Sequence, residues 1–129
     1  MKGKFSLILF LFFSLNAKSQ NDPNNYTIVD HGQLGRKGDS VFFIGKPFTG
    51  KAIKRKRSDE YKDPIVGEEW YTNGVADGNW KEWYISGEKK FEGAFKNGKN
   101  DGVWIEWGKN GTVKRKLTFK NGLLIENKD

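Results

Sequence analysis

The chain has 129 residues, with 23 Lys and Arg against 16 Asp and Glu, a formal net charge of +7, one histidine and no cysteine. The lack of cysteine excludes disulfides, thiolate nucleophiles and cysteine zinc sites, and a single histidine excludes sites that need several histidines. An aromatic content of 15% with 16 glycines is too aromatic for a disordered chain and too rich in glycine for a helical one.

Residues 1–19 have the order of a secretory signal peptide. Lys2 and Lys4 precede an apolar stretch at residues 5–15, and the small residues Ala17 and Ser19 follow it. Because a spanning helix needs about 20 apolar residues, a signal cleaved near Ser19 is favoured over an uncleaved anchor. We therefore expect an exported chain, in the periplasm, at the outer envelope or secreted, with no transmembrane segment after cleavage. Cleavage leaves a net charge of +4, so nucleic acid is not an expected partner.

The segment after the signal predicts a leader and short strands. Residues 20–25 are polar and are expected to be flexible. Residues 26–29 and 41–44 are typical of strands, and the stretch 31–39 between them is rich in turn-forming residues. The expected division of the chain is a signal at 1–19, a leader with an N-terminal strand at 20–40, and a repeat domain at 41–129.

The rest of the chain repeats with a period of 24 residues. Residues 77–83 (DGNWKEW) and 101–107 (DGVWIEW) agree at five of seven positions, and 95–98 and 119–122 both read FKNG. A fixed period of this size predicts stacked supersecondary units. The repeat positions expected to be structural are Gly50, Gly78, Trp80, Gly93, Phe95, Asn97, Gly98, Gly102, Trp104, Phe119 and Gly122.

Each repeat unit predicts a β-hairpin, because aromatic and β-branched residues fill the segments between turn dipeptides. The sequences at 97–98 and 110–111 are Asn-Gly, in which both residues tolerate positive φ, and 86–87 is a weaker Ser-Gly turn. Two-residue turns at 86–87 and 110–111 fix the register of both hairpins, whereas a three-residue loop shifts it by one. The expected cross-strand pairs are Trp80 with Gly93, Lys81 with Glu92, Trp83 with Lys90, Glu106 with Arg115, and Trp107 with Lys114.

Residues 91–98 (FEGAFKNG) followed by Gly102 resemble the membrane-occupation-and-recognition-nexus (MORN) repeat. The Asp-Gly-x-Trp elements and the sequence at 47–51 are similar to its bacterial variant, the YwqK-family antitoxin. The resemblance covers residues 40–124 and implies a single curved sheet of hairpins and an antitoxin- or immunity-like protein partner. The repeat is imperfect, because Gly67 lies two residues before the position matching Gly93 and Leu117 replaces that glycine in the last unit.

The expected register also divides the aromatic side chains between two faces. One face, expected to be packed with the Trp80 indole over Gly93, carries Trp80, Tyr84, Phe91, Phe95, Trp104, Leu117 and Phe119. The other face places indoles beside lysines, an arrangement that can bind a sugar, a partner or a lipid interface, or can pack as a second core. Its members are Trp83, Trp107, Lys90 and Lys114.

Two further groups of residues are candidate sites. A basic cluster can bind an anionic lipid, a glycan or an acidic protein, or can be a solvated strand end. It consists of Lys51, Lys54, Arg55, Lys56 and Arg57. Glu82 and Glu106 occupy equivalent repeat positions and can serve as an acid/base pair, or can be structural residues copied with the repeat.

The sequence predicts an all-β fold, an antiparallel meander of hairpins with a repeat of about 24 residues. No nucleophile motif, phosphate-binding loop or metal-ligand set occurs in the sequence, so neither an enzyme nor a cofactor is expected. The function expected is an exported binding or scaffolding module with a protein partner. The alternatives are recognition of envelope lipid or polysaccharide, through the exposed tryptophans and the basic cluster, and a hydrolase that uses Glu82 and Glu106.

Overall fold

The computed structural model describes residues 20–21, 26–57 and 63–128. Within these ranges the one helical element is the short 3-10 turn η1 (His31–Gln33), and every other element is a strand. The strands are β1 (Gln20–Asn21), β2 (Thr27–Asp30), β3 (Gly35–Lys37), β4 (Ser40–Phe43), β5 (Lys46–Pro47), β6 (Gly50–Arg55), β7 (Ile65–Thr72), β8 (Val75–Trp83), β9 (Lys89–Lys96), β10 (Lys99–Trp107), β11 (Val113–Lys120) and β12 (Leu123–Lys128).

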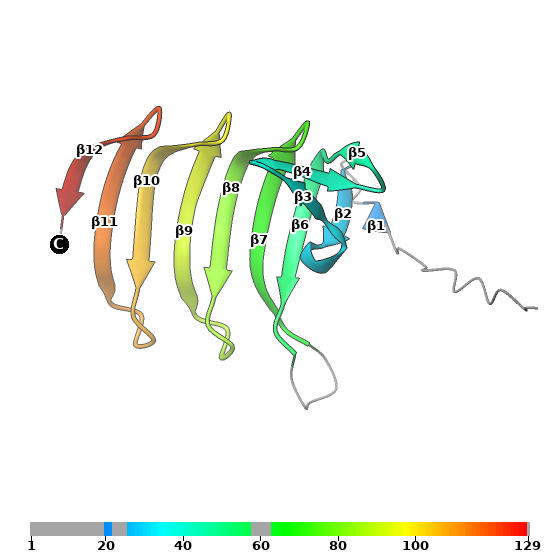
Figure 1. Cartoon of the computed structure of the whole chain (residues 1–129). Helices are drawn as coiled ribbons and strands as arrows, with labels where there is room; N and C mark the ends of the chain where they lie inside the picture. The colour runs from blue at the N-terminus through cyan, green and yellow to red at the C-terminus, as the bar shows by residue number, and fades with distance from the viewer. Residues whose placement is uncertain (1–19, 22–25, 58–62, 129) are drawn as a thin grey trace, which may run out of the picture.

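Nine strands form one large sheet in the order β1-β2-β6-β7-β8-β9-β10-β11-β12. From β6 onward each strand pairs antiparallel with the next strand in the chain, whereas β2 pairs with β6 in parallel. Figure 1 shows these strands side by side in one curved row that ends at β12. The predicted all-β meander of hairpins is therefore confirmed.

Asn-Gly dipeptides close one end of the meander. The turns with positive φ at both residues of this dipeptide are Asn73 with Gly74, Asn97 with Gly98, and Asn121 with Gly122. Such turns match the twist of the flanking strands, which explains why this dipeptide ends each hairpin. The turn glycines also join neighbouring hairpins, since Gly98 N donates to Ala76 O at 2.7 Å and Gly122 N donates to Asn100 O at 2.8 Å.

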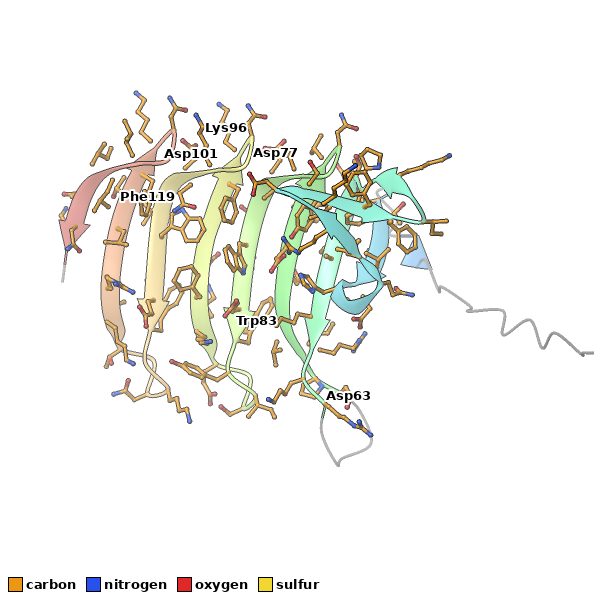
Figure 2. All side chains as sticks on the ribbon, in the orientation of Figure 1. Asp63, Asp77, Trp83, Lys96, Asp101 and Phe119 are labelled. Carbon is orange, nitrogen blue, oxygen red and sulfur yellow. The ribbon has the colours of Figure 1, made fainter. Side chains whose placement is uncertain are left out.

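Longer loops close the opposite end, and here the predicted two-residue turns are wrong. Between β8 and β9, Tyr84 N donates to Glu88 O and Gly87 N donates to Tyr84 O, both at 2.9 Å. Tyr84 and Glu88 are the last hydrogen-bonded pair of this hairpin. The loop between them therefore has three residues, 85–87. The loop between β10 and β11 is built in the same way around Gly111, and Asn110 does not take the positive φ that the turn prediction requires. Figure 2 shows Trp83 toward this end of the sheet and Asp77, Lys96 and Asp101 near the other.

A β-bulge beside each loop restores the predicted register inside the strands. The confirmed pairs are Trp80 with Gly93, Lys81 with Glu92, and Glu106 with Arg115. Next to the loops the pairing shifts, so that Trp83 pairs with Lys89 instead of Lys90, and Trp107 pairs with Val113 instead of Lys114. Those two predicted pairs are wrong because Lys90 and Lys114 are the extra residues of the bulges.

The strands β3, β4 and β5 form a separate small sheet that lies across one face of the large sheet near its N-terminal end (Figure 1). Val41 N donates to Gly74 O at 2.8 Å, and Gly74 N donates to Phe48 O at 2.7 Å, so the turn between β7 and β8 holds this layer. The buried core lies between the two sheets. Its members are Val29, Val41, Phe48, Ala52 and Tyr71.

The N-terminal predictions are confirmed only in part. Gln20 and Asn21, expected in a flexible leader, form β1 and pair with β2, so this part of the prediction is wrong. The strands expected at 26–29 and 41–44 are present as β2 and β4, each shifted by one residue. The expected signal at 1–19 and residues 22–25 of the expected leader lie outside the described residues. Within the described ranges, no helix has the length and apolar character needed to cross a bilayer.

The turn between β4 and β5 gives a first testable prediction. Ile44 has a φ of 50° and is 77% exposed, so a β-branched side chain adopts a left-handed conformation without burial to offset its strain. Replacing Ile44 by asparagine should raise the free energy of unfolding by about 1 kcal/mol, measured by urea denaturation. The reciprocal change, Asn121→Ile in a turn of the same type, should lower it by a similar amount. Equal stabilities in all three proteins would contradict the prediction.

Candidate functional site

Apolar, mostly aromatic side chains form a continuous row on one face of the large sheet. Trp104 is at its centre, because its ring centroid lies 5.0–6.1 Å from those of four other aromatic rings. We call this side the aromatic face, and its row consists of Trp80, Phe91, Phe95, Trp104, Leu117 and Phe119. The predicted grouping of these six residues is confirmed. Tyr84, predicted on the same face, follows the end of β8, and its hydroxyl donates to Trp107 O at 2.8 Å. Mutual packing along the row leaves Trp104 only 5% exposed.

The small sheet covers the aromatic face only near its N-terminal end, where Val41 and Phe48 pack with Ala52 and Tyr71. Farther along, the described residues provide no second layer over β9, β10 and β11 (Figure 1). Phe91, Phe95, Leu117 and Phe119 accordingly stay half-buried. The face that was expected to be a packed interior is thus partly open to solvent.

Gly93 shows how an indole packs on this face. A Cβ added at Gly93 would overlap with the ring of Trp104, so it is Trp104, and not Trp80, that covers this glycine. The predicted cover by Trp80 is wrong although the two residues pair across the strands. Twenty-four positions before Gly93 stands Glu69, which has a side chain where the repeat has none. Trp80, the repeat equivalent of Trp104, instead stacks on Phe95 at a centroid distance of 5.2 Å and an interplanar angle of 22°.

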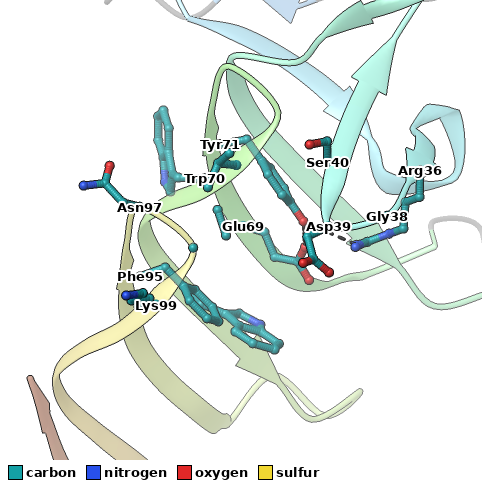
Figure 3. A pocket seen from close by; sticks show the side chains of 14 residues that line it. Arg36, Gly38, Asp39, Ser40, Glu69, Trp70, Tyr71, Phe95, Asn97 and Lys99 are labelled. Atoms are coloured by element: carbon teal, nitrogen blue, oxygen red, sulfur yellow. Dashed lines mark hydrogen bonds between the residues drawn. The ribbon is translucent and has the colours of Figure 1, made fainter. Parts of the chain in front are cut away.

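A pocket of about 540 Å³ lies beside Glu69, where the turn between β3 and β4 extends over the aromatic face. Figure 3 shows Arg36, Asp39 and Glu69 on one side of the pocket and Phe95 on the other. The lining residues that carry the argument below are Arg36, Asp39, Glu69, Trp80, Phe95 and Lys99. The pocket therefore has an aromatic wall from the large sheet and a polar wall to which both sheets contribute.

Hydrogen bonds organise the polar wall. The Tyr71 hydroxyl donates to Glu69 Oε2 at 2.5 Å, and Arg36 donates to the Tyr71 hydroxyl at 3.5 Å. His31 Nε2 lies 3.3 Å from the Arg36 guanidinium and 3.7 Å from Glu69 Oε2. Burial, followed by the hydrogen bond to Glu69, raises the pKa of Tyr71 to about 12. This network holds the Glu69 carboxylate in place.

The raised pKa of Tyr71 predicts that the protein loses stability in strong alkali. Its folded-state pKa of about 12 lies above the ordinary value of 10.0, so its contribution is complete below pH 10.0 and is lost as the pH rises through 12. A shift of this size corresponds to about 2–3 kcal/mol. Urea unfolding across this range should show a steeper fall in the wild type than in Tyr71→Phe. The exposed residue Tyr26 provides the control, and equal slopes in wild type, Tyr26→Phe and Tyr71→Phe would refute the assignment.

A smaller hollow of about 180 Å³ lies farther along the same face. Its apolar part includes Phe91, Trp104, Leu117 and Phe119, and its polar part includes the ion pair between Glu106 and Arg115, whose atoms lie 2.7 Å apart. The hollow thus combines an apolar floor with a neutralised polar rim.

The opposite face carries the two tryptophans predicted as an outer platform. Strand alternation from Trp80 and Trp104 places Trp83 and Trp107 on this side, and both are half-buried. Lys89 accompanies them, because it pairs with Trp83 and its Nζ lies 5.4 Å from the centre of the Trp107 ring. Lys90, expected beside Trp83, instead lies 3.3 Å from Glu82.

The predicted basic cluster is distributed over both sides of β6. Lys51 Nζ lies 3.7 Å from Glu68 and 5.6 Å from the centre of the Trp70 ring, on the face opposite to Lys54. Arg55 Nε lies 3.6 Å from Asp30. The remaining members, Lys56 and Arg57, are exposed where the strand has ended.

The two candidate catalytic carboxylates, Glu82 and Glu106, lie on the aromatic face of β8 and β10 and are separated by β9. Two strand spacings correspond to about 10 Å. Each carboxylate has a basic partner, Lys90 for Glu82 and Arg115 for Glu106. Within the described residues, no group of three or more metal-ligating side chains occurs.

Sequence reasoning missed the residues of the polar wall, Arg36, Asp39, Glu69 and Tyr71. The available signal was Glu69, which stands where the next repeat has Gly93. Comparisons of the chain with protein-family models, curated proteins and solved structures find no match. The resemblance to MORN repeats therefore stays a prediction.

Proposed function

We propose that this chain is an exported, non-enzymatic binding module of MORN-like repeats that holds a protein partner on the uncovered part of its aromatic face. The antitoxin-like or immunity-like role implied by the repeat resemblance is part of this proposal. The observation that carries it is the open row of half-buried rings around the hollow of about 180 Å³.

The size and lining of this hollow favour an apolar side chain of a protein as its occupant. Binding energy at protein interfaces concentrates where an aromatic or aliphatic anchor fills a pocket that neighbouring residues keep dry. Phe91, Leu117 and Phe119 line such a pocket, and Leu124 of β12 pairs with Phe119 and is 52% exposed. The partner surface would thus extend from the hollow onto the last strand.

The charges beside the row favour a protein over an anionic lipid or glycan. Glu82 pairs with Lys90, and Glu106 pairs with Arg115, so these two bases beside the row are neutralised. A protein surface of mixed polarity can exchange hydrogen bonds with these groups while its apolar anchor is buried. An anionic ligand would meet two carboxylates.

A pair of matched variants tests this assignment. Leu117→Arg places a charge in the hollow, whereas Thr118→Arg introduces the same charged side chain on the opposite face of the same strand. Both variants and the wild type are expressed from the full-length gene, recovered from the native envelope, and checked for folding by circular dichroism. We expect one stoichiometric protein to co-purify with the wild type and with Thr118→Arg, and to be lost from Leu117→Arg.

Equal retention by both variants would contradict the proposed surface. Salt-sensitive binding to anionic vesicles without any stoichiometric protein would contradict the partner class. Export has a separate readout, since the intact mass of the recovered chain should correspond to a start at Gln20 and not at Met1.

A further inference from the structure

The pocket of about 540 Å³ is a consequence of one residue that breaks the repeat. At Gly93 the chain has no side chain, and the indole of Trp104 lies directly over the backbone. The equivalent position holds Glu69, whose side chain would occupy the place of the indole, and Trp80 stacks on Phe95 instead. The space beside Trp80 therefore stays open, and the turn between β3 and β4 borders it on the side of the small sheet.

The lining of this pocket is polar but balanced in charge. Arg36 and Lys99 contribute two positive charges, and Asp39 and Glu69 contribute two negative charges. An anion would face the carboxylates, and a cation would face the guanidinium and the ammonium. A wholly apolar ligand would remove these charged groups from water without replacing their hydrogen bonds, which is costly.

We propose that this pocket binds a neutral saccharide. A sugar ring has an apolar C–H face, which can stack on the Trp80 indole and Phe95, and a rim of hydroxyls that both donate and accept hydrogen bonds. The Glu69 and Asp39 carboxylates accept such hydrogen bonds, and the Arg36 guanidinium donates them. A neutral saccharide thus matches both the aromatic wall and the charge-balanced polar wall.

The pocket is also built in advance of binding. The Tyr71 hydroxyl holds the Glu69 carboxylate from a buried position, and Arg36 contacts both His31 and Tyr71. A pre-organised polar wall reduces the entropy lost when a ligand binds. The volume lies within the range of small-molecule sites, about 300–1,000 Å³.

This inference goes beyond the proposed protein-binding function and does not depend on it. It uses the end of the aromatic face beneath the small sheet, whereas the proposed partner surface extends from Phe91 of β9 over β10, β11 and β12. It also differs from recognition of polysaccharide by Trp83, Trp107 and the basic cluster, because those tryptophans lie on the opposite face.

Nuclear magnetic resonance of the indole N–H groups tests the proposal directly. The chain has five tryptophans, and the signal of Trp80 is assigned by its disappearance in Trp80→Phe. The folded protein is titrated with maltose, cellobiose, lactose, mannobiose and N,N'-diacetylchitobiose. We expect at least one of these sugars to shift the Trp80 signal saturably, with millimolar or tighter affinity, while the Trp83 and Trp107 signals stay in place.

Variants of Glu69 and its neighbour provide the controls. Glu69→Gly restores the glycine of the repeat, lets Trp80 settle over the strand, and should weaken sugar binding about tenfold or more. Glu69→Gln keeps the size of the side chain and should weaken binding less. Glu68→Gln, on the opposite face, should leave it unchanged.

Three results would overturn the proposal. They are the absence of any saturable shift of Trp80 with the whole panel, sugar-dependent shifts confined to Trp83 or Trp107, and unchanged affinity in both Glu69 variants.

Discussion

Replacing Trp104 by alanine is expected to lower the free energy of unfolding by about 3–5 kcal/mol, the largest effect of any tryptophan substitution. The ring is 5% exposed, covers Gly93 and contacts four other aromatic rings. Its removal opens a cavity in the middle of the row, and neighbours on both sides lose their packing surface. Urea unfolding followed by circular dichroism measures the loss.

Two control variants separate ring packing from other contributions. Trp104→Phe keeps an aromatic ring and removes a buried indole N–H that has no hydrogen-bond partner among the described residues, so it should cost much less than alanine. Trp107→Ala, on the opposite face, should cost about 1 kcal/mol, because this half-buried ring lies at the end of its strand. Equal, large losses for Trp104→Ala and Trp107→Ala would mean that both faces of the sheet act as core.

Replacing Gly50 by alanine is expected to destabilise the protein by about 3 kcal/mol or more, from backbone strain and steric overlap together. Gly50 has a φ of 147°, a conformation that side chains rarely adopt. An added Cβ would overlap with the backbone oxygen of Thr27 and approach Phe48 Cζ at 3.0 Å. Because the nearest neighbour is backbone, it cannot move aside without disturbing the parallel pairing of β2 with β6.

Gly111→Ala is the matched control for the steric overlap expected at Gly50. Gly111 also has a positive φ, 79°, but a Cβ there would meet no atom of the described part of the chain within 4 Å. This change should cost about 1 kcal/mol, from conformation alone. If both glycine variants lose the same stability, the close approach of β2 to Gly50 does not contribute.

The hairpins could be predicted from the sequence because the residues that specify each turn are adjacent in the chain. Asn97 followed by Gly98 specifies a tight turn through its own conformational preferences, and the period of 24 residues transfers that inference to the other units. The register inside the strands was correct although the loops were wrong. The three-residue loop between β8 and β9 shifts the strand pairing by one residue, and the bulge at Lys90 shifts it back by one residue.

The small sheet and the pocket depend on contacts that no local pattern reveals. β3, β4 and β5 are short, and their position follows from hydrogen bonds between Val41, Phe48 and the distant turn at Gly74. Arg36 and Asp39 reach the pocket only because that layer folds over the aromatic face. Glu69 is visible as a departure from the repeat, but its consequence requires the observation that Trp104 covers Gly93.

The order of strand pairing has a consequence for how the molecule folds. From β7 to β12 every paired strand is adjacent in the chain, so each hairpin can close over a short loop. The turn hydrogen bonds of Gly98 and Gly122 then align each hairpin with the preceding one. Contacts between near neighbours form quickly, because little chain entropy is lost in closing them. The parallel pairing of β2 with β6 instead spans all of β3, β4 and β5. In pulse-labelled hydrogen exchange during refolding, we expect amides of β8 to β11 to become protected before those of β2. The layer that encloses the pocket is then assembled last, and the pocket exists only in the completely folded chain.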